Sequence, residues 1–263
     1  QDGSSYSIYQ QRYSAQGTAV GGEVRVNTTA SAQYDNTVTA LTDGGWLVSW
    51  ASWAQDGDAG GIFQQRYSAQ GTTVGGEVQV NTTTNEQDYA SVTALPDGGW
   101  LVSWESLGQD GNDGGIYQQR YTASGEPTGG EVQVNTTTAG HQFDPRVTAL
   151  ADGGWLVTWM SPDGSATGIY QQRFTETGTP TGGESRVNIT TSSGQENPRV
   201  TALADGGWLV SWTSSNQDGD PSGGIRQLRY DAAGAVVGRD KLNGDGAANN
   251  LVFSGLTPVD MAG

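Results

Sequence analysis

The octapeptide DGGWLVSW, which begins at Asp43, recurs with at most one change at Asp97, Asp152 and Asp205. Consecutive copies lie 54, 55 and 53 residues apart. A fixed period of about this size is the signature of propellers, solenoids and other arrays, in which each repeat is one supersecondary unit that packs on its neighbours. The repeat therefore limits the fold of this chain more strongly than its composition does.

Three further markers keep the same phase as the octapeptide. The first is QQRY or a variant of it, the second is GGEV or GGES followed by an asparagine, and the third is a leucine after segments such as RVTA. The arginines of the first marker are Arg12, Arg66, Arg120, Arg173 and Arg229. The asparagines are Asn27, Asn81, Asn135 and Asn188. The leucines are Leu41, Leu95, Leu150 and Leu203, and the next position in phase holds Leu256. The repeat therefore extends from one end of the chain to the other.

Each unit contains four short segments that favour β-strands. VTAL, GWLVSW, GIYQQRY and EVQVN are rich in β-branched and aromatic residues, and glycine-containing turns separate them. Within GWLVSW, successive residues such as Trp46 and Leu47 point to opposite faces of the strand. Both faces carry side chains suited to burial. No segment shows the i, i+3, i+4, i+7 pattern of an amphipathic helix. The sequence predicts an all-β protein.

The unit length selects among all-β architectures. A solenoid uses shorter coils, and a sandwich domain needs about 100 residues, whereas four strands in about 50 residues match a propeller blade. The chain begins with the third and fourth strands of a unit, continues through four complete units, and ends with one first strand around Leu256. We therefore expect residues 1–263 to form a single five-bladed β-propeller, closed by its N- and C-terminal strands. The closing blade has no clear second strand, so either VDMA is a degenerate substitute or the chain was cut from a longer array.

Composition narrows the possible partners. The chain has 263 residues, a net charge of −16 and no cysteine, which excludes disulfides and thiolate metal sites. No run of 18 apolar residues exists, so we expect no membrane insertion. The acidic charge repels nucleic acid and anionic membranes, and suits cations or neutral sugars.

Residues that recur in every unit are expected to be structural. The repeated arginines have plausible partners in the aspartates of DGGW and the glutamates of GGEV. The paired glutamines fit either side-chain contacts between strands or binding of sugar hydroxyls. Each asparagine starts an NTT or NIT sequon, but its fixed place favours a loop-capping role over glycosylation. The single histidine, His141, is expected to be a surface loop residue.

Acidic loops before GIYQQRY suggest calcium. Calcium binds six to eight oxygens, and closely spaced Asp and Asn residues separated by glycine let several oxygens converge. The candidate ligands are Asp56, Asp58, Asp110, Asn112, Asp113, Asp218 and Asp220. The EF-hand spacing with its closing glutamate is absent, and exposed Asp-Gly turns without an ion remain the alternative.

Aromatic residues that occur in only one unit are candidates for a ligand site. Trp53 precedes the first acidic loop, and Tyr34, Tyr89 and Phe143 precede the VTAL-type strands. Aromatic faces on propeller loops suit sugar binding, although exposed loop aromatics also occur without a ligand.

The repeat GGWLVSWxSxxQDGxxxGIYQQRYxxxGxxxGGEVQVNTTT resembles repeats of large secreted bacterial proteins of the RTX or haemolysin-type calcium-binding class. This resemblance implies a secreted or cell-surface bacterial module. Five-bladed lectin propellers are similar in architecture only. We therefore predict a non-catalytic, adhesin- or lectin-like binding module for cell-surface or extracellular glycans, assisted by calcium. The alternatives are a structural spacer without a ligand and a glycan-acting enzyme that uses paired carboxylates.

Overall fold

The computed structural model of the chain describes residues 6–215 and 223–241. Within these ranges all regular secondary structure is β, with 18 antiparallel strands in five sheets and no helix. The all-β prediction is confirmed. Because the described residues hold no helix, none of them forms a helix that could cross a membrane.

The sheets follow the repeat. A two-stranded sheet contains β1 (Tyr9–Tyr13) and β2 (Ala19–Arg25). The next sheet contains β3 (Gln33–Ala40), β4 (Trp46–Trp53), β5 (Gly60–Tyr67) and β6 (Thr73–Gln79). The third contains β7 (Gln87–Ala94), β8 (Trp100–Leu107), β9 (Gly114–Tyr121) and β10 (Pro127–Gln133). The fourth contains β11 (Phe143–Ala149), β12 (Trp155–Pro162), β13 (Thr167–Phe174) and β14 (Pro180–Arg186). The last contains β15 (Gln195–Ala202), β16 (Trp208–Ser214), β17 (Gly224–Tyr230) and β18 (Val236–Lys241).

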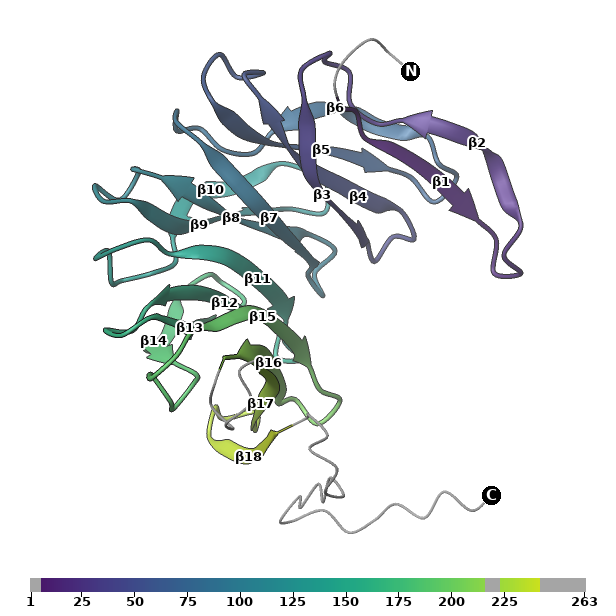
Figure 1. The fold of residues 1–263 in the computed structure, drawn as a ribbon. Coiled ribbons are helices and arrows are strands. Elements are labelled where there is room, and N and C mark those ends of the chain that lie inside the picture. Colours follow the sequence, from purple (N-terminus) through teal and green to yellow (C-terminus); the bar gives the residue numbers. More distant parts are fainter. Residues whose placement is uncertain (1–5, 216–222, 242–263) are drawn as a thin grey trace, which may run out of the picture.

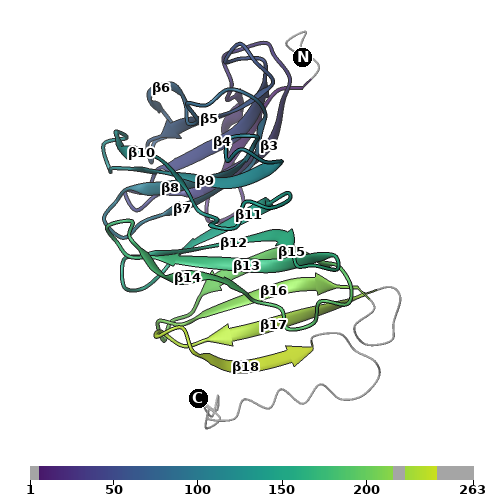
Figure 2. The same cartoon turned by 90° about the vertical axis from the view of Figure 1, so that its left-hand side faces the viewer.

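The sheets are arranged as successive blades around an arc. Each four-stranded sheet is a meander, and the first strands β3, β7, β11 and β15 lie next to one another on the inner side (Figures 1 and 2). Side chains connect these inner strands, since Val147 N donates to Ser91 Oγ at 3.1 Å and Ala149 N to Thr93 Oγ1 at 3.1 Å. The propeller-like repeat is therefore confirmed.

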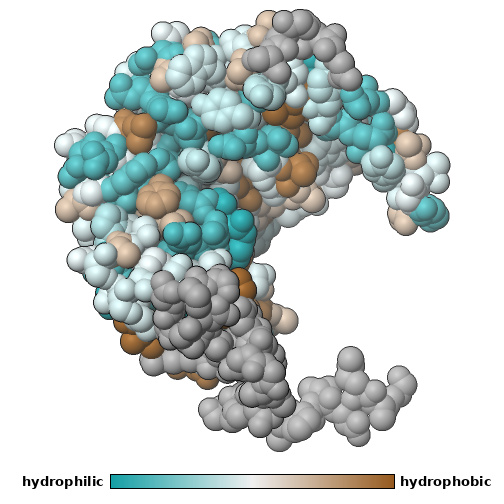
Figure 3. Space-filling model, viewed as in Figure 1, coloured by the Kyte–Doolittle hydropathy of each residue, from teal (hydrophilic) through white to brown (hydrophobic). Residues whose placement is uncertain are grey.

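The predicted closed ring of five blades is not confirmed. The described strands form an arc with a concave side that stays open between the β1–β2 sheet and the β15–β18 sheet (Figures 1 and 3). The segment around Leu256, which was expected to supply the closing strand, lies outside the described residues.

The DGG tripeptide forms the turn between the first two strands of each blade. In the first copy, Leu41 N donates to Gly45 O at 2.9 Å and the Asp43 carboxylate accepts from Gly45 N at 2.8 Å. Gly44 has a φ of 83°, and a Cβ on Gly45 would lie 2.2 Å from Tyr67 O. Both glycines are required, one for its backbone conformation and one for the close approach of the neighbouring strand.

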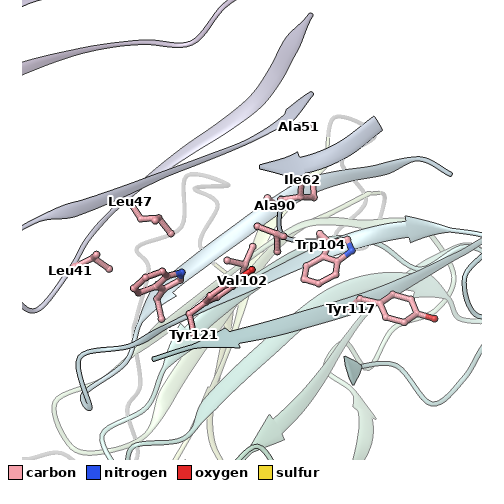
Figure 4. Packing of buried hydrophobic residues seen from close by; sticks show 11 residues of the cluster. Leu41, Leu47, Ala51, Ile62, Ala90, Val102, Trp104, Tyr117 and Tyr121 are labelled. Atoms are coloured by element: carbon pink, nitrogen blue, oxygen red, sulfur yellow. The ribbon is translucent and has the colours of Figure 1, made fainter. Parts of the chain in front are cut away.

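Buried apolar side chains fill the spaces between sheets. Figure 4 shows one such cluster, in which Leu47 and Ile62 of one sheet face Val102 and Trp104 of the next. Leu47 is 1% exposed, so the second face of the GWLVSW strand is buried, as the alternating pattern predicted. At about 25 cal/mol per Å², burial of these side chains is the main favourable contribution to blade stacking.

The repeated polar residues also join neighbouring blades. Trp100 Nε1 donates to Gln64 Oε1 of the preceding sheet at 3.0 Å, and the Arg66 guanidinium lies over the Trp100 ring at 5.4 Å. Arg66 also pairs with Asp43 at 2.7 Å. The same Trp–Gln and Arg–Trp contacts recur at Trp46, Trp155 and Trp208. The predicted Arg–Asp pairs are confirmed, and the first glutamine of each pair serves this packing. Glu77 instead accepts the Thr28 backbone N–H at 2.8 Å.

The asparagine of each NTT or NIT sequon is a buried cap. Asn81 accepts the Ile62 backbone N–H at 2.7 Å and donates to Thr83 O at 3.0 Å and Gln87 Oε1 at 2.6 Å. It is 2% exposed. The capping role is confirmed, and a glycan on this amide would displace all of these contacts.

Candidate active site

A bulge interrupts each inner strand near its start. The pairing with the second strand shifts between Tyr34 and Thr37 in β3, and at the corresponding places in β7, β11 and β15. One non-glycine residue in each bulge has a positive φ: Asp35 (48°), Tyr89 (54°), Asp144 (53°) and Asn197 (54°). Such residues are uncommon, carry a conformational cost, and cluster at functional sites. The bulges therefore identify one end of the inner strands as a candidate functional site.

An open cavity of about 300 Å³ lies at this end. Its lining includes Asp35 and Thr37 of β3, Tyr89 and Ser91 of β7, and Arg146 of β11. Three adjacent blades thus contribute polar side chains to one hollow.

Arg146 lies between two carboxyl groups of the cavity region. Its Nη2 is 2.6 Å from Asp144 Oδ1, and only 26% of the Arg146 side chain is exposed. Burial raises the pKa of Asp35; the charge of Asp144 adds to this increase and the charge of Arg146 opposes it. Burial also lowers the pKa of Arg146, against the effect of Asp144. The guanidinium therefore opposes the effect of burial on Asp35 and forms an ion pair with Asp144.

Asp88 precedes the cavity residue Tyr89 in β7, is not itself part of the cavity lining, and has a raised pKa. Burial raises its pKa to about 7; a hydrogen bond with Tyr34 opposes this increase, and the charges of Glu86 and Asp35 add to it. Asp88 Oδ1 is buried and has no hydrogen-bond partner among the described residues. Burial and the charge of Asp88 also raise the pKa of Tyr34. Burial thus shifts Asp88 strongly toward its protonated form.

A second buried carboxyl group lies on β8, in register opposite Asp88. Glu105 of β8 is 5% exposed, and its Oε1 is 2.5 Å from His141 Nε2. Burial raises the pKa of Glu105, and His141 opposes this increase. His141 therefore does more than the surface role expected from the sequence, because its half-exposed ring contacts a buried carboxyl group.

This arrangement can perform acid–base chemistry. Two carboxyl groups whose environments differ can divide the roles of proton donor and ionised partner. Asp88 holds a proton near pH 7, whereas Asp35 and Asp144 lie within the influence of Arg146. Hydrolysis of a glycosidic bond needs such a pair.

The aromatic candidates from the sequence occupy different places. Tyr89 lines the cavity, Tyr34 contacts Asp88, and Phe143 packs on His141 with ring centroids 5.0 Å apart. Trp53 lies 49% exposed at the end of β4, opposite Gly60, and outside the cavity lining. Ligand binding by these four residues stays a prediction.

Sequence reasoning did not identify the charged residues beside these aromatics. They are Asp35, Asp88, Asp144, Arg146 and Glu105. Only Glu105 offered a clear signal, because its position holds the uncharged residues Ala51, Met160 and Thr213 in the other units. Asp35 and Asp144 share one position of their units, and Arg146 recurs as Arg199.

The acidic loops give little support to a metal site. Asp56 accepts the Asp58 backbone N–H at 3.2 Å, and Asp58 accepts the Asn85 N–H at 3.0 Å. In the next unit, Asp110 accepts the Asn112 N–H at 3.0 Å. Within residues 6–215 and 223–241, no group of three or more His, Asp or Glu side chains could hold a metal ion. Asp113 belongs to the same turn as Asn112, while Asp218 and Asp220 lie outside the described residues. Asp56 and Asp110 each use one carboxylate oxygen to cap their own turn, and Asp58 accepts from a neighbouring loop, so any calcium ion would need backbone carbonyls and water among its ligands.

Comparison with known proteins identifies solved structures that share the fold. No family model and no curated protein sequence matches the chain. The endo-arabinase from Bacteroides thetaiotaomicron aligns with a TM-score of 0.51 at 16% identity, over 80% of this chain and 81% of that one. A thermostable family-43 glycoside hydrolase aligns with a TM-score of 0.51 at 14% identity, over 78% and 75%. A PL25 polysaccharide lyase (an ulvan lyase) aligns with a TM-score of 0.56 at 12% identity, over 80% of this chain and 58% of the lyase.

These neighbours correct two predictions. The structures that share the fold are glycoside hydrolases and a polysaccharide lyase, not proteins of the RTX or haemolysin type. The prediction of a non-catalytic, adhesin- or lectin-like module is contradicted by these neighbours, which are glycoside hydrolases and a polysaccharide lyase. The sequence reasoning treated recurring residues as structural and looked for a ligand site among loop aromatics, whereas Asp35, Asp88 and Asp144 stand beside those aromatics at the bulges of the inner strands.

Proposed function

We propose that this chain is a glycan-acting enzyme that hydrolyses glycosidic bonds in neutral polysaccharides. The observation that carries the proposal is the pairing of Asp88, whose pKa burial raises to about 7, with Asp35, which lines the cavity and whose charge adds to that increase. The shared fold with glycan-acting enzymes supports it.

Each side chain has a role in this proposal. Asp88 donates its proton to the leaving oxygen, because burial keeps it protonated near neutral pH. Asp35, which is exposed to the cavity, is the ionised partner on the sugar side. Arg146 keeps Asp144 in place through the 2.6 Å ion pair, and Tyr89 offers an aromatic face to the sugar ring.

Hydrolysis fits the site better than lyase chemistry. A lyase needs a base that removes a proton next to an acidic group, and the tyrosines here are poor bases because burial raises the pKa of both Tyr34 and Tyr89. The wall also carries several carboxyl groups against one guanidinium, which is already paired with Asp144. Together with a net charge of −16, this disfavours uronate polymers and favours neutral glycans.

The test is a turnover assay on a panel of polysaccharides. Purified protein is incubated with neutral polymers (arabinan, galactan, xylan) and anionic ones (ulvan, polygalacturonate), and new reducing ends are measured. We expect activity on a neutral polymer, and a loss of about 10²–10⁴-fold in Asp88→Asn and Asp35→Asn. Asp163→Asn, in the β12–β13 loop, is the matched control and should keep wild-type activity. Cleavage only of anionic polymers, with unsaturated uronate products, would refute hydrolysis in favour of a lyase.

We further propose that the arc closes as a five-bladed propeller and that the protein acts outside the cell. In-phase Leu256 supports the first point, and the external location of most polymeric glycans supports the second. Deletion of residues 247–263 should lower the melting temperature of the whole protein if the ring closes. Equal melting of both forms would contradict closure, and recovery of the native protein only from the cytosol would contradict secretion.

A further inference from the structure

We infer that Trp53 binds a sugar unit of the polymer next to Asp88, on the leaving-group side of the bond that is cut. The inference rests on the proposed function, because it takes Asp88 as the proton donor to the leaving oxygen. Trp53 lies outside the cavity lining. Its place on the sheet nonetheless brings it close to Asp88.

The packing of the blades does not require a tryptophan at this place. Trp53 is 49% exposed, whereas Trp50 on the same strand is completely buried. The equivalent residues of the next two units are Leu107 and Pro162, since each is paired with the residue that starts the third strand of its sheet. An aromatic face that the fold leaves half in water is suited to contact with a ligand.

Trp53 is directly opposite Gly60 on the neighbouring strand. A Cβ on Gly60 would lie 2.8 Å from Tyr34 Oη and 3.5 Å from Asp88 Oδ1. Directly opposite residues of an antiparallel pair extend their side chains from the same face, with Cβ atoms about 4.5–5.5 Å apart. The Trp53 side chain therefore starts within about 9 Å of Asp88 Oδ1, on the face of the sheet that Asp88 contacts. Its ring is within reach of a sugar bonded to the oxygen that Asp88 protonates.

Asp88 has neighbours both at the cavity and at Trp53. Tyr89, the next residue, lines the cavity together with Asp35, while Gly60 adjoins Asp88 Oδ1. In the proposed reaction Asp35 acts on the sugar held in the cavity, and Asp88 donates its proton to the leaving oxygen. A sugar on the leaving side therefore continues out of the cavity past Asp88, and Trp53 is an exposed aromatic residue on that path.

The backbone at Trp53 is fixed by hydrogen bonds and carries strain. Trp53 N donates to Ala32 O at 2.9 Å, and the next residue, Ala54, donates to Ala59 O at 2.5 Å. Ala54 has a φ of 56°, whereas the next unit places Gly108 in this turn with a φ of 72°. Alanine pays a conformational cost here that glycine avoids, and such costs cluster at functional sites. A fixed backbone also lets Trp53 bind a sugar with little loss of conformational freedom.

The experiment separates the leaving group from the sugar that reacts. Trp53→Ala removes the aromatic face, Trp53→Phe keeps one, and Trp53→Leu keeps apolar bulk and introduces the residue that the next unit holds at Leu107. Ile189→Ala, at another exposed apolar side chain, is the matched control. For each variant, kcat/KM is measured on the neutral polymer and on the glycosyl fluoride of the same sugar, whose leaving group is too small to reach Trp53. Affinity electrophoresis through gels that contain the polymer measures binding without turnover.

We expect kcat/KM on the polymer to fall about 10–100-fold in Trp53→Ala and Trp53→Leu, and less than about threefold in Trp53→Phe, because the aromatic face makes the contact. On the glycosyl fluoride all three variants should stay within about twofold of the wild type, because the leaving sugar is absent. Ile189→Ala should match the wild type on both substrates.

Two results would overturn the inference when the polymer is cleaved. One is wild-type kcat/KM on the polymer in Trp53→Ala, and the other is an equal loss on the polymer and the fluoride, which would assign the effect to the reacting sugar. If the wild type cleaves no polysaccharide, the proposed function fails by itself, and the gels decide whether Trp53 binds sugar. Retardation of the wild type that Trp53→Ala loses would support binding, whereas equal retardation of both proteins, or none, would overturn it.

Discussion

The side chains of Asp88 on β7 and Tyr34 on β3 share a hydrogen bond across the junction of two blades. This bond stabilises the charged form of Asp88, and it opposes the burial that raises the Asp88 pKa to about 7. The acidity of the proposed proton donor therefore depends on a residue from the neighbouring sheet.

Replacement of Tyr34 tests this dependence. Tyr34→Phe removes the hydrogen bond and leaves the burial, so the pKa of Asp88 should rise further. Because Asp88 must be protonated to act, the alkaline limb of kcat/KM, near pH 7 in the wild type, should move to higher pH. Phenylalanine fits this position, since β11 holds Phe143 at the same place. Tyr13→Phe, at an exposed tyrosine, is the control. An alkaline limb that stays in place would show that Asp88 is not the donor.

The raised pKa of Asp88 also affects stability. The folded protein holds this proton more tightly than the unfolded chain, whose Asp pKa is about 3.9, so stability is lost as pH rises between that value and about 7. Asp88→Asn cannot become charged. It should be more stable than the wild type near pH 8, and the difference should vanish near pH 4. Urea unfolding at both pH values measures it.

Asp205→Asn is a control of opposite sign. The Gly207 backbone N–H and Arg229 lower the pKa of Asp205, so its contribution is present above the unfolded pKa and lost as pH falls through the folded one. This variant should be less stable than the wild type at neutral pH and equal to it in acid. If Asp88→Asn behaved in the same way as Asp205→Asn, the assigned environment of Asp88 would be wrong.

The repeat made most of the fold predictable. The alternation in GWLVSW predicted burial of both faces, which Leu47 and Trp50 show, and the regular Arg and Asp positions predicted pairs such as Arg66 with Asp43. These features are local or repeat from one unit to the next. Closure of the ring depends on how each blade turns relative to its neighbour, and small rotations accumulate along the arc. The pattern of a single unit does not encode that sum.

The candidate site was only partly predictable. Of the predicted aromatic residues, Tyr89 lines the cavity and Tyr34 contacts Asp88, while ligand binding by them stays a prediction. The acids beside them were missed because they lie at different positions of their units. Asp35 is the positive-φ residue of its bulge, whereas Asp88 immediately precedes the positive-φ residue Tyr89. Their chemistry comes from burial between sheets, which is a property of the assembled blades.

Loss of one asparagine cap should destabilise the protein measurably. Asn81→Ala leaves the buried Ile62 N–H and Gln87 Oε1 without their partner, at a cost of about 1–3 kcal/mol in the free energy of unfolding. Thr84→Ala, an exposed change in the same loop, should be close to neutral. Chemical denaturation compares the two. Equal effects would mean that Asn81 does not cap the loop.

Calcium binding by the acidic loops stays a prediction, and melting curves test it. If the loops bind calcium with a Kd of about 10⁻⁴–10⁻³ M, the melting temperature should rise in millimolar calcium and fall with EDTA. Asp58→Ala and Asp220→Ala should each reduce the response. Magnesium at the same concentration controls for screening of the net charge of −16. Melting curves that are identical in calcium, magnesium and EDTA would exclude a calcium role for these loops.

The contacts of Arg66 predict different salt dependence for two neighbouring variants. Asp43→Asn removes only an ion pair whose aspartate is 46% exposed, so it should lower the free energy of unfolding by about 0–1 kcal/mol. In about 1 M salt the variant and the wild type should be equally stable, because the ion pair is screened. Arg66→Ala also removes the stacking on Trp100 and the hydrogen bond from Nη1 to Ala123 O at 2.7 Å. It should cost about 1–3 kcal/mol, most of it retained in high salt because the stacked surface is buried between blades. Urea unfolding of both variants at low and high salt gives the comparison. If salt abolished the Arg66→Ala effect as well, the ion pair would be the only contribution of Arg66, and the repeated Arg–Trp stacking would add nothing to blade packing.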